Sequence, residues 1–542
     1  MNGAEALLRT LLDAGIEVCF TNPGTSEMHF VAALDRVEGM RCVLGLFEGV
    51  VSGAADGYAR IAGKPAATLL HLGPGFGNAI ANVHNARKGH VAMLNIVGDH
   101  ATSHAQYETP LTSDILGLAS PVSHWLQSSP TPAHVAADGA EAAAAARSGP
   151  GQIATLVLPA DVSWGESPTG PAAPVPPQAP RKAHEEAIEA AGAALDGSEP
   201  AMILLDGYVS DAEFDCAARI AAHTGARLAL ATFPTRFPWG AGRPTCERVP
   251  YLAEFAIDHL KTVRRLVRVG ATGPVSFFAY PGLPGLLTPE DCHAVTLAEP
   301  HQDRLDALER LAEALGATQA EYVRNALALP PLPVGADRAH DSSAGDHGRG
   351  HGPLPGGVPL SAGVVADVVA ALLPEGAIVV DEGITGSIEF YPRLRGARPH
   401  EWLLQTGGAI GWGLPAALGA AIAAPERKVV CLEGDGSAMY TIQALWTMAR
   451  ERADVTVLLF ANRDYAILQL EFQRVGAQRM GSTARGMMHL GDPEIDFVAL
   501  ARSMGVEASR VTSSDEFTIA FGQAMDTPGP RLIELAMPPL FS

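Results

Sequence analysis

VVCLEGDGSAMYTIQALW, residues 429–446, is the stretch that decides the fold. An apolar run ends at Leu432, a Gly-Asp-Gly-Ser turn follows, and a helix is predicted after the turn. At the carboxyl end of a parallel strand, backbone N–H groups and the start of the next helix bind phosphate well. Glycine also lets the backbone approach a phosphate closely. Gly434, Gly436 and Ser437 are therefore candidate diphosphate contacts.

A second turn, Ala461-Asn462-Arg463-Asp464, follows the next predicted strand. One helix and one strand separate the two turns, so we expect them to lie side by side at the same edge of a parallel sheet. Asp435 offers a carboxylate oxygen, Asn462 an amide oxygen and Asp464 a backbone carbonyl oxygen. Together with phosphate oxygens and a water, this ligand set suits octahedral Mg²⁺. The sequence therefore predicts a metal–diphosphate site.

Strands alternate with helices along most of the chain, which predicts an α/β protein with parallel sheets covered on both faces. Near the N-terminus, for example, a strand at 66–70 is expected to lead through a Gly-rich turn at 73–77 into a helix from Asn78. We expect three doubly wound domains in series, at residues 1–165, 184–329 and 358–542.

Two connecting segments separate these regions. Residues 166–180 are rich in proline and are expected to form an ordered linker across the surface. Residues 330–357 contain almost no large apolar side chain, so we predict a flexible linker. Its histidines, His340, His347 and His351, are expected to be solvated rather than bound to a metal, because no fixed backbone holds them.

Composition narrows the classes of function. The 542 residues carry a formal net charge of -21, which argues against nucleic acid as a partner. The apolar runs are too short for a membrane span, and the N-terminus lacks the layout of a signal peptide. We therefore expect a cytoplasmic protein without a membrane partner. The six cysteines form no CxxC pair and are expected to be free thiols.

Glu48 stands in LGLFEGVVSGAADGYAR, between an apolar strand and a helix of small residues. Taken alone, it is an ordinary acid at a helix N-terminus, where the helix dipole favours negative charge. The alternative interpretation is a functional carboxyl group at a strand-to-helix junction, where apolar surroundings can raise a pKa. The residues of the chain by themselves leave both interpretations open.

Several motifs resemble thiamine-diphosphate-dependent enzymes of the pyruvate oxidase, acetolactate synthase and benzoylformate decarboxylase group. They include FTNPGTSEMHF at 20–30, LLHLGPGFGNAIANVHNARKGH at 69–90, ATFPTRFP at 231–238, QTGGAIGWGLPAALGAAIAAPER at 405–427 and the GDGS turn. The resemblance covers nearly the whole chain. It implies a pyrimidine-binding, a middle and a diphosphate-binding domain, with thiamine diphosphate and Mg²⁺ as cofactors. It also implies a homodimer or homotetramer with active sites at the subunit interface.

The resemblance further implies roles for single residues. Glu48 would promote loss of the cofactor's C2 proton, and the Gly408 carbonyl would accept a bond from the aminopyrimidine. Ile410 would bend the cofactor. His71 matches a catalytic histidine, and Thr25 matches an active-site serine. A histidine at the end of a strand is otherwise often structural, but near neutral pH it can also relay protons.

The chain departs from the family pattern at several points. Ala461 replaces the first asparagine of the usual pair. The middle region reads VSFFAYPGLPG at 275–285, without the histidine of the decarboxylase, so that Phe277, Phe278 or Tyr280 would stand nearby. Glu471 falls where that enzyme places an aromatic side chain against its substrate.

His100, His104 and Tyr107 follow a predicted strand. They either line the substrate pocket or have a structural role. The middle region shows no convincing dinucleotide turn, so we do not expect FAD.

The leading functional hypothesis is decarboxylation of a 2-oxo acid, with release of an aldehyde or carboligation to a second carbonyl compound. The alternative is an acetolactate synthase-like transferase that condenses 2-oxo acids. Two observations favour the decarboxylase: the presence of His71, and the lack of a convincing dinucleotide-binding turn for FAD in the middle region. A coenzyme-A-dependent lyase stays open, as does a regulatory protein that binds the cofactor without turnover, although intact Glu48, Asp435 and Asn462 argue against the latter.

Overall fold

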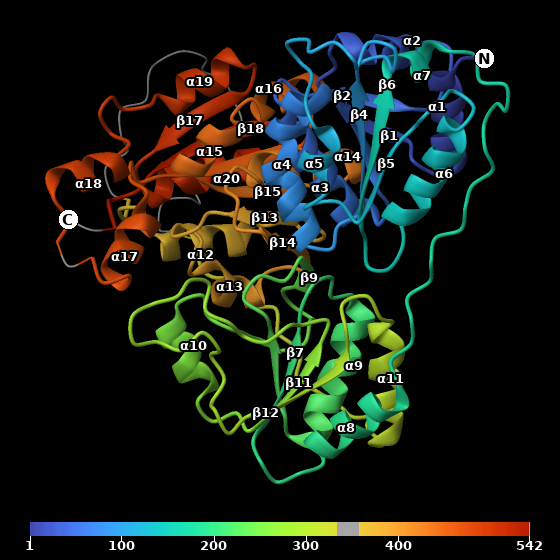
Figure 1. The fold of residues 1–542 in the computed structure, drawn as a ribbon. Coiled ribbons are helices and arrows are strands. Elements are labelled where there is room, and N and C mark those ends of the chain that lie inside the picture. The colour runs from blue at the N-terminus through green and yellow to red at the C-terminus, as the bar shows by residue number, and fades with distance from the viewer. Residues whose placement is uncertain (333–356, 478, 541–542) are drawn as a thin grey trace. The chain divides into compact units, whose positions relative to one another are not determined.

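The computed structural model describes residues 1–332, 357–477 and 479–540. It contains three sheets in which nearly all strand pairs are parallel, which confirms the predicted α/β class (Figure 1). The chain divides into two compact units, each described here by itself. The histidines His340, His347 and His351, and most of the predicted flexible linker at 330–357, lie outside the described residues.

The first unit consists of Met1–Pro180, Gln405–Glu426 and Met439–Val455. Its sheet has six parallel strands in the order β2-β1-β3-β4-β6-β5. The strands are β1 (Val18–Thr21), β2 (Arg41–Leu44), β3 (Ala66–Leu70), β4 (Met93–Asp99), β5 (Trp125–Ser128) and β6 (Ile153–Pro159). The helices are α1 (Gly3–Asp13), η1 (Thr25–Glu27), α2 (Met28–Leu34), α3 (Glu48–Ala62), α4 (Leu72–Lys88), α5 (Ile115–Ala119), α6 (Val135–Ala146), α7 (Ala160–Trp164), α14 (Gly413–Ala423) and α16 (Ala444–Glu451).

The second unit consists of Arg181–Leu404, Arg427–Ala438 and Thr456–Ser542, and it holds two sheets. The five-stranded sheet is parallel and has the order β10-β8-β7-β11-β12. Its strands are β7 (Ala201–Leu205), β8 (Arg227–Leu230), β10 (Glu247–Arg248), β11 (Arg265–Val269) and β12 (His293–Ala298). The helices that contact this sheet are α8 (Glu185–Leu195), α9 (Asp211–Thr224), α10 (Ala253–Leu260) and α11 (Arg304–Ala314).

The seven-stranded sheet has the order β17-β18-β16-β15-β13-β14-β9. Its strands are β9 (Arg236–Trp239), β13 (Ile378–Glu382), β14 (His400–Leu404), β15 (Val429–Gly434), β16 (Val455–Ala461), β17 (Glu507–Val511) and β18 (Arg531–Ala536). The remaining helices of this unit are α12 (Ala362–Leu372), α13 (Phe390–Arg393), η3 (Leu394–Gly396), α17 (Ala466–Arg474), α18 (Ser482–Met488), α19 (Phe497–Ser503) and α20 (Ser514–Asp526). Helix α15 (Asp435–Thr441) is divided between the two units.

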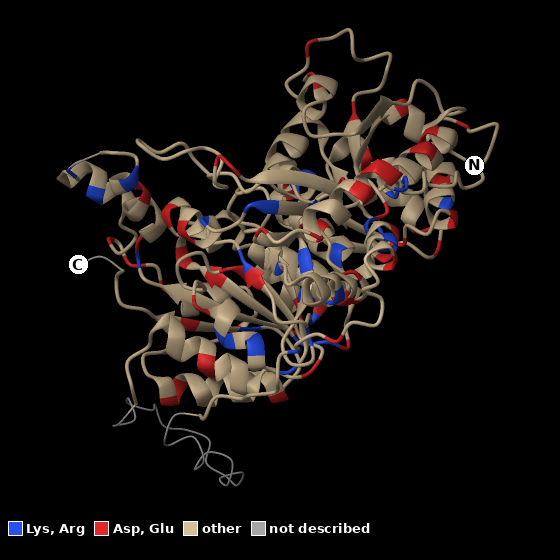
Figure 2. Cartoon of the chain, turned by 90° about the horizontal axis from the view of Figure 1, so that it is seen from below, with Lys and Arg blue, Asp and Glu red and all other residues tan. Residues whose placement is uncertain are grey.

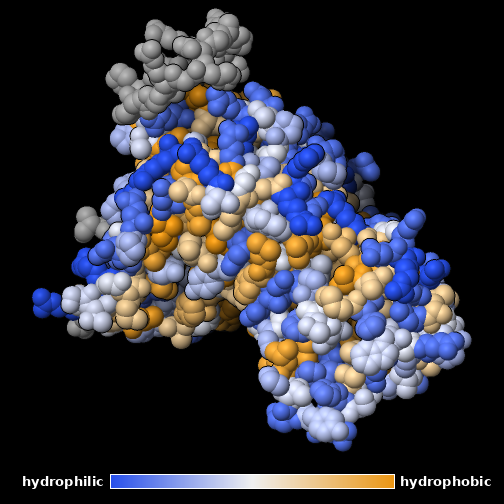
Figure 3. Space-filling model, turned by 90° about the horizontal axis from the view of Figure 1, so that it is seen from above, coloured by the Kyte–Doolittle hydropathy of each residue, from blue (hydrophilic) through white to orange (hydrophobic). Residues whose placement is uncertain are grey.

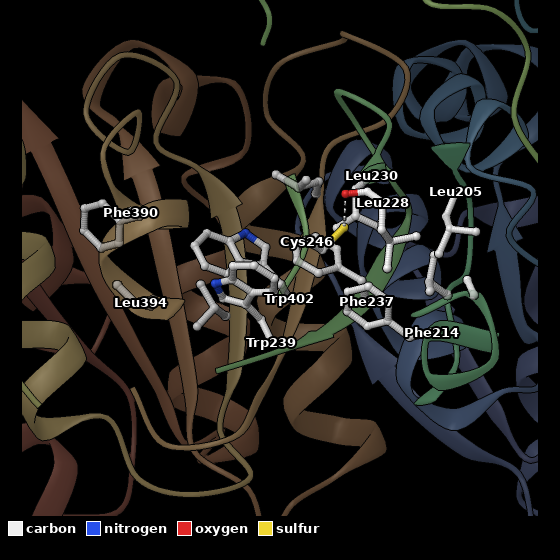
Figure 4. Close-up of a cluster of buried hydrophobic side chains, with 14 of the residues drawn as sticks. Leu205, Phe214, Leu228, Leu230, Phe237, Trp239, Cys246, Phe390, Leu394 and Trp402 are labelled. Atoms are coloured by element: carbon white, nitrogen blue, oxygen red, sulfur yellow. Dashed lines mark hydrogen bonds between the residues drawn. The ribbon is translucent and has the colours of Figure 1, made fainter. Parts of the chain in front are cut away.

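β9 departs from the expectation of purely parallel sheets. It comes from the middle of the chain and pairs antiparallel with β14, with Phe237 opposite Trp402. The two rings stack at a centroid distance of 6.0 Å, and Trp239 stacks on Tyr391 at 4.2 Å. Figure 4 shows the buried side chains of Phe237, Trp239 and Trp402 together with Cys246, whose Sγ donates to the Leu228 carbonyl at 3.4 Å. Burial of several large aromatic rings stabilises this antiparallel addition.

The predicted Gly-rich turn at 73–77 is wrong. α4 begins at Leu72, directly after His71, and it includes these glycines. Two of them are closely packed: a Cβ at Gly73 would overlap the Ser113 side chain, and one at Gly75 would make a tight contact of 3.3 Å with Glu48 Oε1. Close packing, rather than a turn, therefore explains Gly73 and Gly75.

Helices α3 and α14 of the first unit approach each other at their glycines. A Cβ at Gly57 would overlap the carbonyl oxygen of Ala416, and a Cβ at Gly419 would overlap the carbonyl oxygen of Ala54. Neither clash involves a flexible side chain, so the helix axes themselves would have to separate. Small residues at these positions set the distance between the two helices.

We expect Gly57→Ala to lower the free energy of unfolding by about 2–3 kcal/mol, because an added methyl group in a filled interior forces the backbone apart. Gly77→Ala on α4 is the matched control, since a Cβ there meets nothing within 4 Å. Alanine should leave stability unchanged or raise it at that site, by up to about 1 kcal/mol. Urea titrations monitored by circular dichroism measure both effects. Equal midpoints for the two variants would contradict the packing argument.

Acidic and basic residues are interspersed along the helices and loops of the ribbon in Figure 2, with acidic residues in excess over the whole chain. Each of the six cysteines is free, as expected. Among the described residues, the helices are all too short or too polar to cross a bilayer.

Candidate functional site

The GDGS segment in the second unit is built around the Asp435 carboxylate. β15 carries the chain to Gly434, and α15 starts at Asp435, which is 4% exposed. Its Oδ1 accepts from the backbone N–H of Gly436 at 2.8 Å, and its Oδ2 accepts from the N–H of Arg463 at 2.7 Å. Burial raises the pKa of Asp435 to about 6, although these N–H groups oppose the rise.

The second turn lies beside the first, as predicted, because β15 and β16 are neighbours and the Asp435–Arg463 bond links the two turns. Asn462 follows β16, and its Oδ1 accepts from the N–H of Asp464 at 3.0 Å. The Asp464 carboxylate is itself held by His489 Nδ1 at 3.0 Å. Its backbone carbonyl, rather than its carboxylate, therefore suits the role of a ligand.

These residues fit a hard cation with a diphosphate. The donors are a carboxylate, an amide and a carbonyl oxygen, which are the ligands Mg²⁺ prefers. Gly436 keeps the turn narrow, because a Cβ there would overlap the Tyr465 ring. The part of the chain that the structure describes holds no group of three or more His, Cys, Asp or Glu side chains suited to a metal. The proposed ligand set instead combines one carboxylate with an amide oxygen and a backbone carbonyl oxygen.

Glu48 lies in the first unit, as the first residue of α3. The apolar β2 and the small-residue helix α3 place it at a junction where it is 7% exposed. Its Oε2 accepts from Asn78 Nδ2 of α4 at 3.0 Å. Glu48 therefore has one fixed hydrogen bond, and its other oxygen faces the narrow space beside Gly75.

His71 immediately precedes α4 and pairs with Glu27. Their Nδ1 and Oε2 atoms lie 2.8 Å apart, and the same carboxylate oxygen accepts from the N–H of Gly24 at 2.7 Å. The Glu27 side chain is 1% exposed, whereas that of His71 is 22% exposed. Burial raises the pKa of Glu27, and the neighbouring imidazole opposes this effect. The arrangement is a partly exposed imidazole oriented by a buried carboxyl group.

Glu27 is not among the site residues predicted from the sequence. Its only local signal was its position three residues after Gly24, because a glutamate there reaches back to the Gly24 backbone at the start of η1. Gly24 itself is required for space, since a Cβ would overlap the His71 ring. Thr25 begins η1 and is exposed, so its hydroxyl is accessible on the same segment.

The loop before α14 also belongs to the first unit and carries Gly408 and Ile410. Gly408 is exposed and has a φ of 79°, a conformation that favours glycine. Asn85 of α4 makes two hydrogen bonds to the backbone of Ala409 in this loop. Its Oδ1 accepts from the Ala409 N–H at 3.1 Å, and its Nδ2 donates to the Ala409 carbonyl at 2.8 Å. Asn82 donates to the Gly411 carbonyl at 3.1 Å. Helix α4 thus positions His71 at its start and this loop along its length.

His100, His104 and Tyr107 follow β4 in an irregular segment. Their rings form a row, with His104 lying 5.8 Å from His100 and 5.3 Å from Tyr107. His100 Nε2 also contacts the Thr109 hydroxyl at 3.0 Å. Tyr107 is 56% exposed. These contacts organise the segment, and no described contact joins the row to His71 or Glu48.

Comparisons with known proteins agree on one family. The model of the thiamine pyrophosphate enzyme N-terminal TPP binding domain matches residues 1–129, and that of the C-terminal TPP binding domain matches residues 385–535. The chain is 50% identical to the Mycobacterium tuberculosis protein named "Putative acetolactate synthase large subunit IlvX", over 100% of both chains. It is 29% identical to benzoylformate decarboxylase from Pseudomonas aeruginosa, over 96% of each chain. The solved benzoylformate decarboxylase from Polynucleobacter necessarius shares the fold, with a TM-score of 0.82 at 21% identity and complete coverage of both chains.

Proposed function

Because the chain belongs to the thiamine pyrophosphate enzyme family, we propose that it decarboxylates a 2-oxo acid with thiamine diphosphate and Mg²⁺. The product is released as an aldehyde or joined to a second carbonyl compound. In this proposal the protein acts in the cytoplasm as a homodimer or homotetramer, without a nucleic-acid or membrane partner. Light scattering of the purified protein tests the assembly, and a monomer at micromolar concentration would contradict it.

Two sets of residues would hold the cofactor, and in the proposed assembly they meet across the subunit interface. Asp435, Asn462 and the Asp464 carbonyl would bind Mg²⁺, while Gly434, Gly436 and Ser437 would contact the diphosphate. Gly408 and Ile410 would contact the aminopyrimidine end. When bound, thiamine diphosphate supplies a carbon nucleophile that takes up the electrons left by the departing carbon dioxide. Glu48 would hold a proton at the aminopyrimidine, where its anchorage by Asn78 fixes its orientation.

The His71–Glu27 pair is the observation that carries the proposed decarboxylation. Release of an aldehyde requires a proton to be delivered to carbon, and a partly exposed imidazole can receive that proton from water. The buried Glu27 carboxyl fixes the ring through Nδ1, which leaves Nε2 for the proton transfer. Thr25 offers a hydroxyl for the substrate carboxylate on the same segment as Glu27.

An acetolactate synthase-like transferase is the second candidate, and the 50% identical relative favours it. In that reaction two 2-oxo acids condense with loss of one carbon dioxide. Measuring carbon dioxide and acetolactate from pyruvate, together with a panel of other 2-oxo acids, separates the two candidates. Abundant acetolactate would replace the first proposal by the second. Cofactor binding without turnover on the whole panel would argue against both.

Glu27→Gln is expected to lower kcat/KM about tenfold or more, because the neutral amide can still contact the His71 ring but lacks the charge of the carboxylate. Burial raises the pKa of Glu27, so protonation of this carboxyl group should contribute to the fall of activity on the acid side, and the variant should lack that contribution. A pH profile of kcat/KM measures this difference. The exposed Glu38→Gln in the same unit is the control and should leave the profile unchanged. An unaltered rate and profile in Glu27→Gln would remove the pair from the mechanism.

A further inference from the structure

Glu471 lies in the second unit, on α17, and is 8% exposed. One of its carboxylate oxygens is well bonded. Oε1 accepts from Arg474 Nη1 at 2.8 Å and from the Tyr251 hydroxyl at 3.1 Å. These two donors hold the carboxylate in a fixed orientation.

The charges around Glu471 do not balance. Arg474 also pairs with Glu254, at 2.7 Å between Nη2 and Oε2, and its guanidinium lies over the Tyr280 ring, 3.9 Å from the centroid. One cation is therefore shared by two carboxylates. Burial raises the pKa of Tyr251 and of Tyr280, and the nearby Glu471 carboxylate raises each further. Both tyrosines thus remain neutral, and the two carboxylates with one guanidinium leave an excess negative charge.

The second oxygen, Oε2 of Glu471, is buried and has no hydrogen-bond partner among the residues that the structure describes. A buried charged acceptor without a donor is costly, and native proteins seldom retain one. Filling Oε2 with a donor would recover this cost. The bonds to Oε1 fix the carboxylate, so the direction of Oε2 is fixed as well.

Aromatic side chains form a wall beside this carboxylate. Tyr251, which bonds Glu471, packs edge to face with Phe233 at 6.0 Å and with Phe277 at 5.6 Å, and Phe277 contacts Phe278 at 4.9 Å. Phe277 and Phe278 are 44% and 52% exposed. Apolar side chains reach the surface in several places on the face drawn in Figure 3. An apolar wall with one oriented polar group is the usual composition of a small-molecule site.

The same helix connects this group to the proposed metal site, because α17 begins at Ala466, two residues after Asp464. We propose that Glu471 Oε2 accepts a hydrogen bond from the far end of the substrate, which makes the preferred substrate a 2-oxo acid with a distal donor such as a hydroxyl group. This inference rests on the proposed function. The aromatic wall covers the chain between the two ends of such a substrate, and Glu471 rejects acids with an apolar end.

Two pairs of substrates test the inference, each differing by a hydroxyl in place of a methyl group. They are 4-hydroxy-2-oxobutanoate with 2-oxopentanoate, and 4-hydroxyphenylglyoxylate with 4-methylphenylglyoxylate. We expect kcat/KM to favour the hydroxyl member of at least one pair by about tenfold or more, because the methyl member leaves the buried oxygen unpaired. Glu471→Leu should reverse the preference within that pair. Glu471→Gln should also remove the preference, because its one acceptor oxygen would face Arg474 and Tyr251 and its NH₂ group, a donor, would take the place of Oε2.

Gln473→Leu, at an exposed position of the same helix, is the matched control; its substrate ratio should equal that of the unmodified protein. Substrate-induced shifts of the melting temperature in a Glu48→Gln background should show the same preference without turnover. Equal rates within both pairs, or a ratio that Glu471→Leu does not alter, would overturn the inference while leaving the proposed function in place. Failure to turn over any 2-oxo acid would instead overturn the proposed function. In that case a larger melting-temperature shift with the hydroxyl member of a pair would support the inference, and equal shifts would overturn it.

Discussion

Glu48→Gln is expected to reduce turnover of every 2-oxo acid by at least about 100-fold while the protein still binds thiamine diphosphate. The amide can accept the hydrogen bond from Asn78, so the local packing survives. It cannot hold or release the proton that activation of the cofactor requires, and loss of a positioned acid–base group costs about 10²–10⁴ in rate. Carbon dioxide release measures turnover, and isothermal titration measures binding of the cofactor.

A matched control separates this role from a simple helix-dipole effect. Glu185 is the first residue of α8, just as Glu48 is the first residue of α3, but its side chain is 68% exposed. Glu185→Gln should leave turnover unchanged, and both variants should lose only about 1 kcal/mol or less of stability, the usual contribution of a charge to the dipole. Full activity in Glu48→Gln would refute the proposed mechanism.

Asp435→Ala is expected to weaken binding of Mg²⁺–thiamine diphosphate by at least about 100-fold. The variant lacks the only carboxylate in the proposed ligand set, and hard cations depend on anionic oxygen. Cofactor at 100 times its dissociation constant stabilises a protein by about 2.7 kcal/mol, so the cofactor-dependent rise in melting temperature should largely disappear.

The cofactor-free variant provides the internal check. Burial raises the pKa of Asp435 to about 6, above its ordinary value, so the ionised carboxylate at pH 7 costs the folded state stability. Removing it should leave the melting temperature of the cofactor-free protein within a few degrees, despite the lost bonds to Gly436 and Arg463. Asp526→Ala, at an exposed position of α20, should retain the full response to cofactor. A normal response in Asp435→Ala would exclude Asp435 as a ligand.

Local order along the chain was predictable from sequence. The apolar run before Gly434 and the turn after it predict β15 followed by α15, and the regular alternation places β16 beside β15. Glu48 was predictable as the start of a helix for the same reason. These features depend on hydrophobic periodicity and on residues close together in the chain, which sequence displays directly.

Contacts between distant segments were not predictable in the same way. Glu27 and His71 are 44 positions apart, and nothing in either segment specifies the other as its partner. The hydrogen bond between Asn85 and the loop at Gly408 joins residues that are more than three hundred positions apart in the sequence. The glycines of α4 resembled a turn because glycine is permissive, whereas the actual reason for them is the closeness of Ser113 and Glu48. Packing of this kind depends on tertiary structure, which overrides local preference.

β9 is the edge strand of the seven-stranded sheet and covers the backbone hydrogen-bonding groups of β14. Without it, β14 would present a row of unpaired N–H and carbonyl groups, the kind of edge on which chains aggregate. Pro238, which cannot donate a backbone hydrogen bond, lies within β9, where it discourages addition of a further strand. A shortened chain that lacks residues 181–329 would lose this edge strand together with the five-stranded sheet. The middle third of the sequence thus supplies the last strand of a sheet that otherwise belongs to the last third, and the two parts share one continuous hydrogen-bonded ladder.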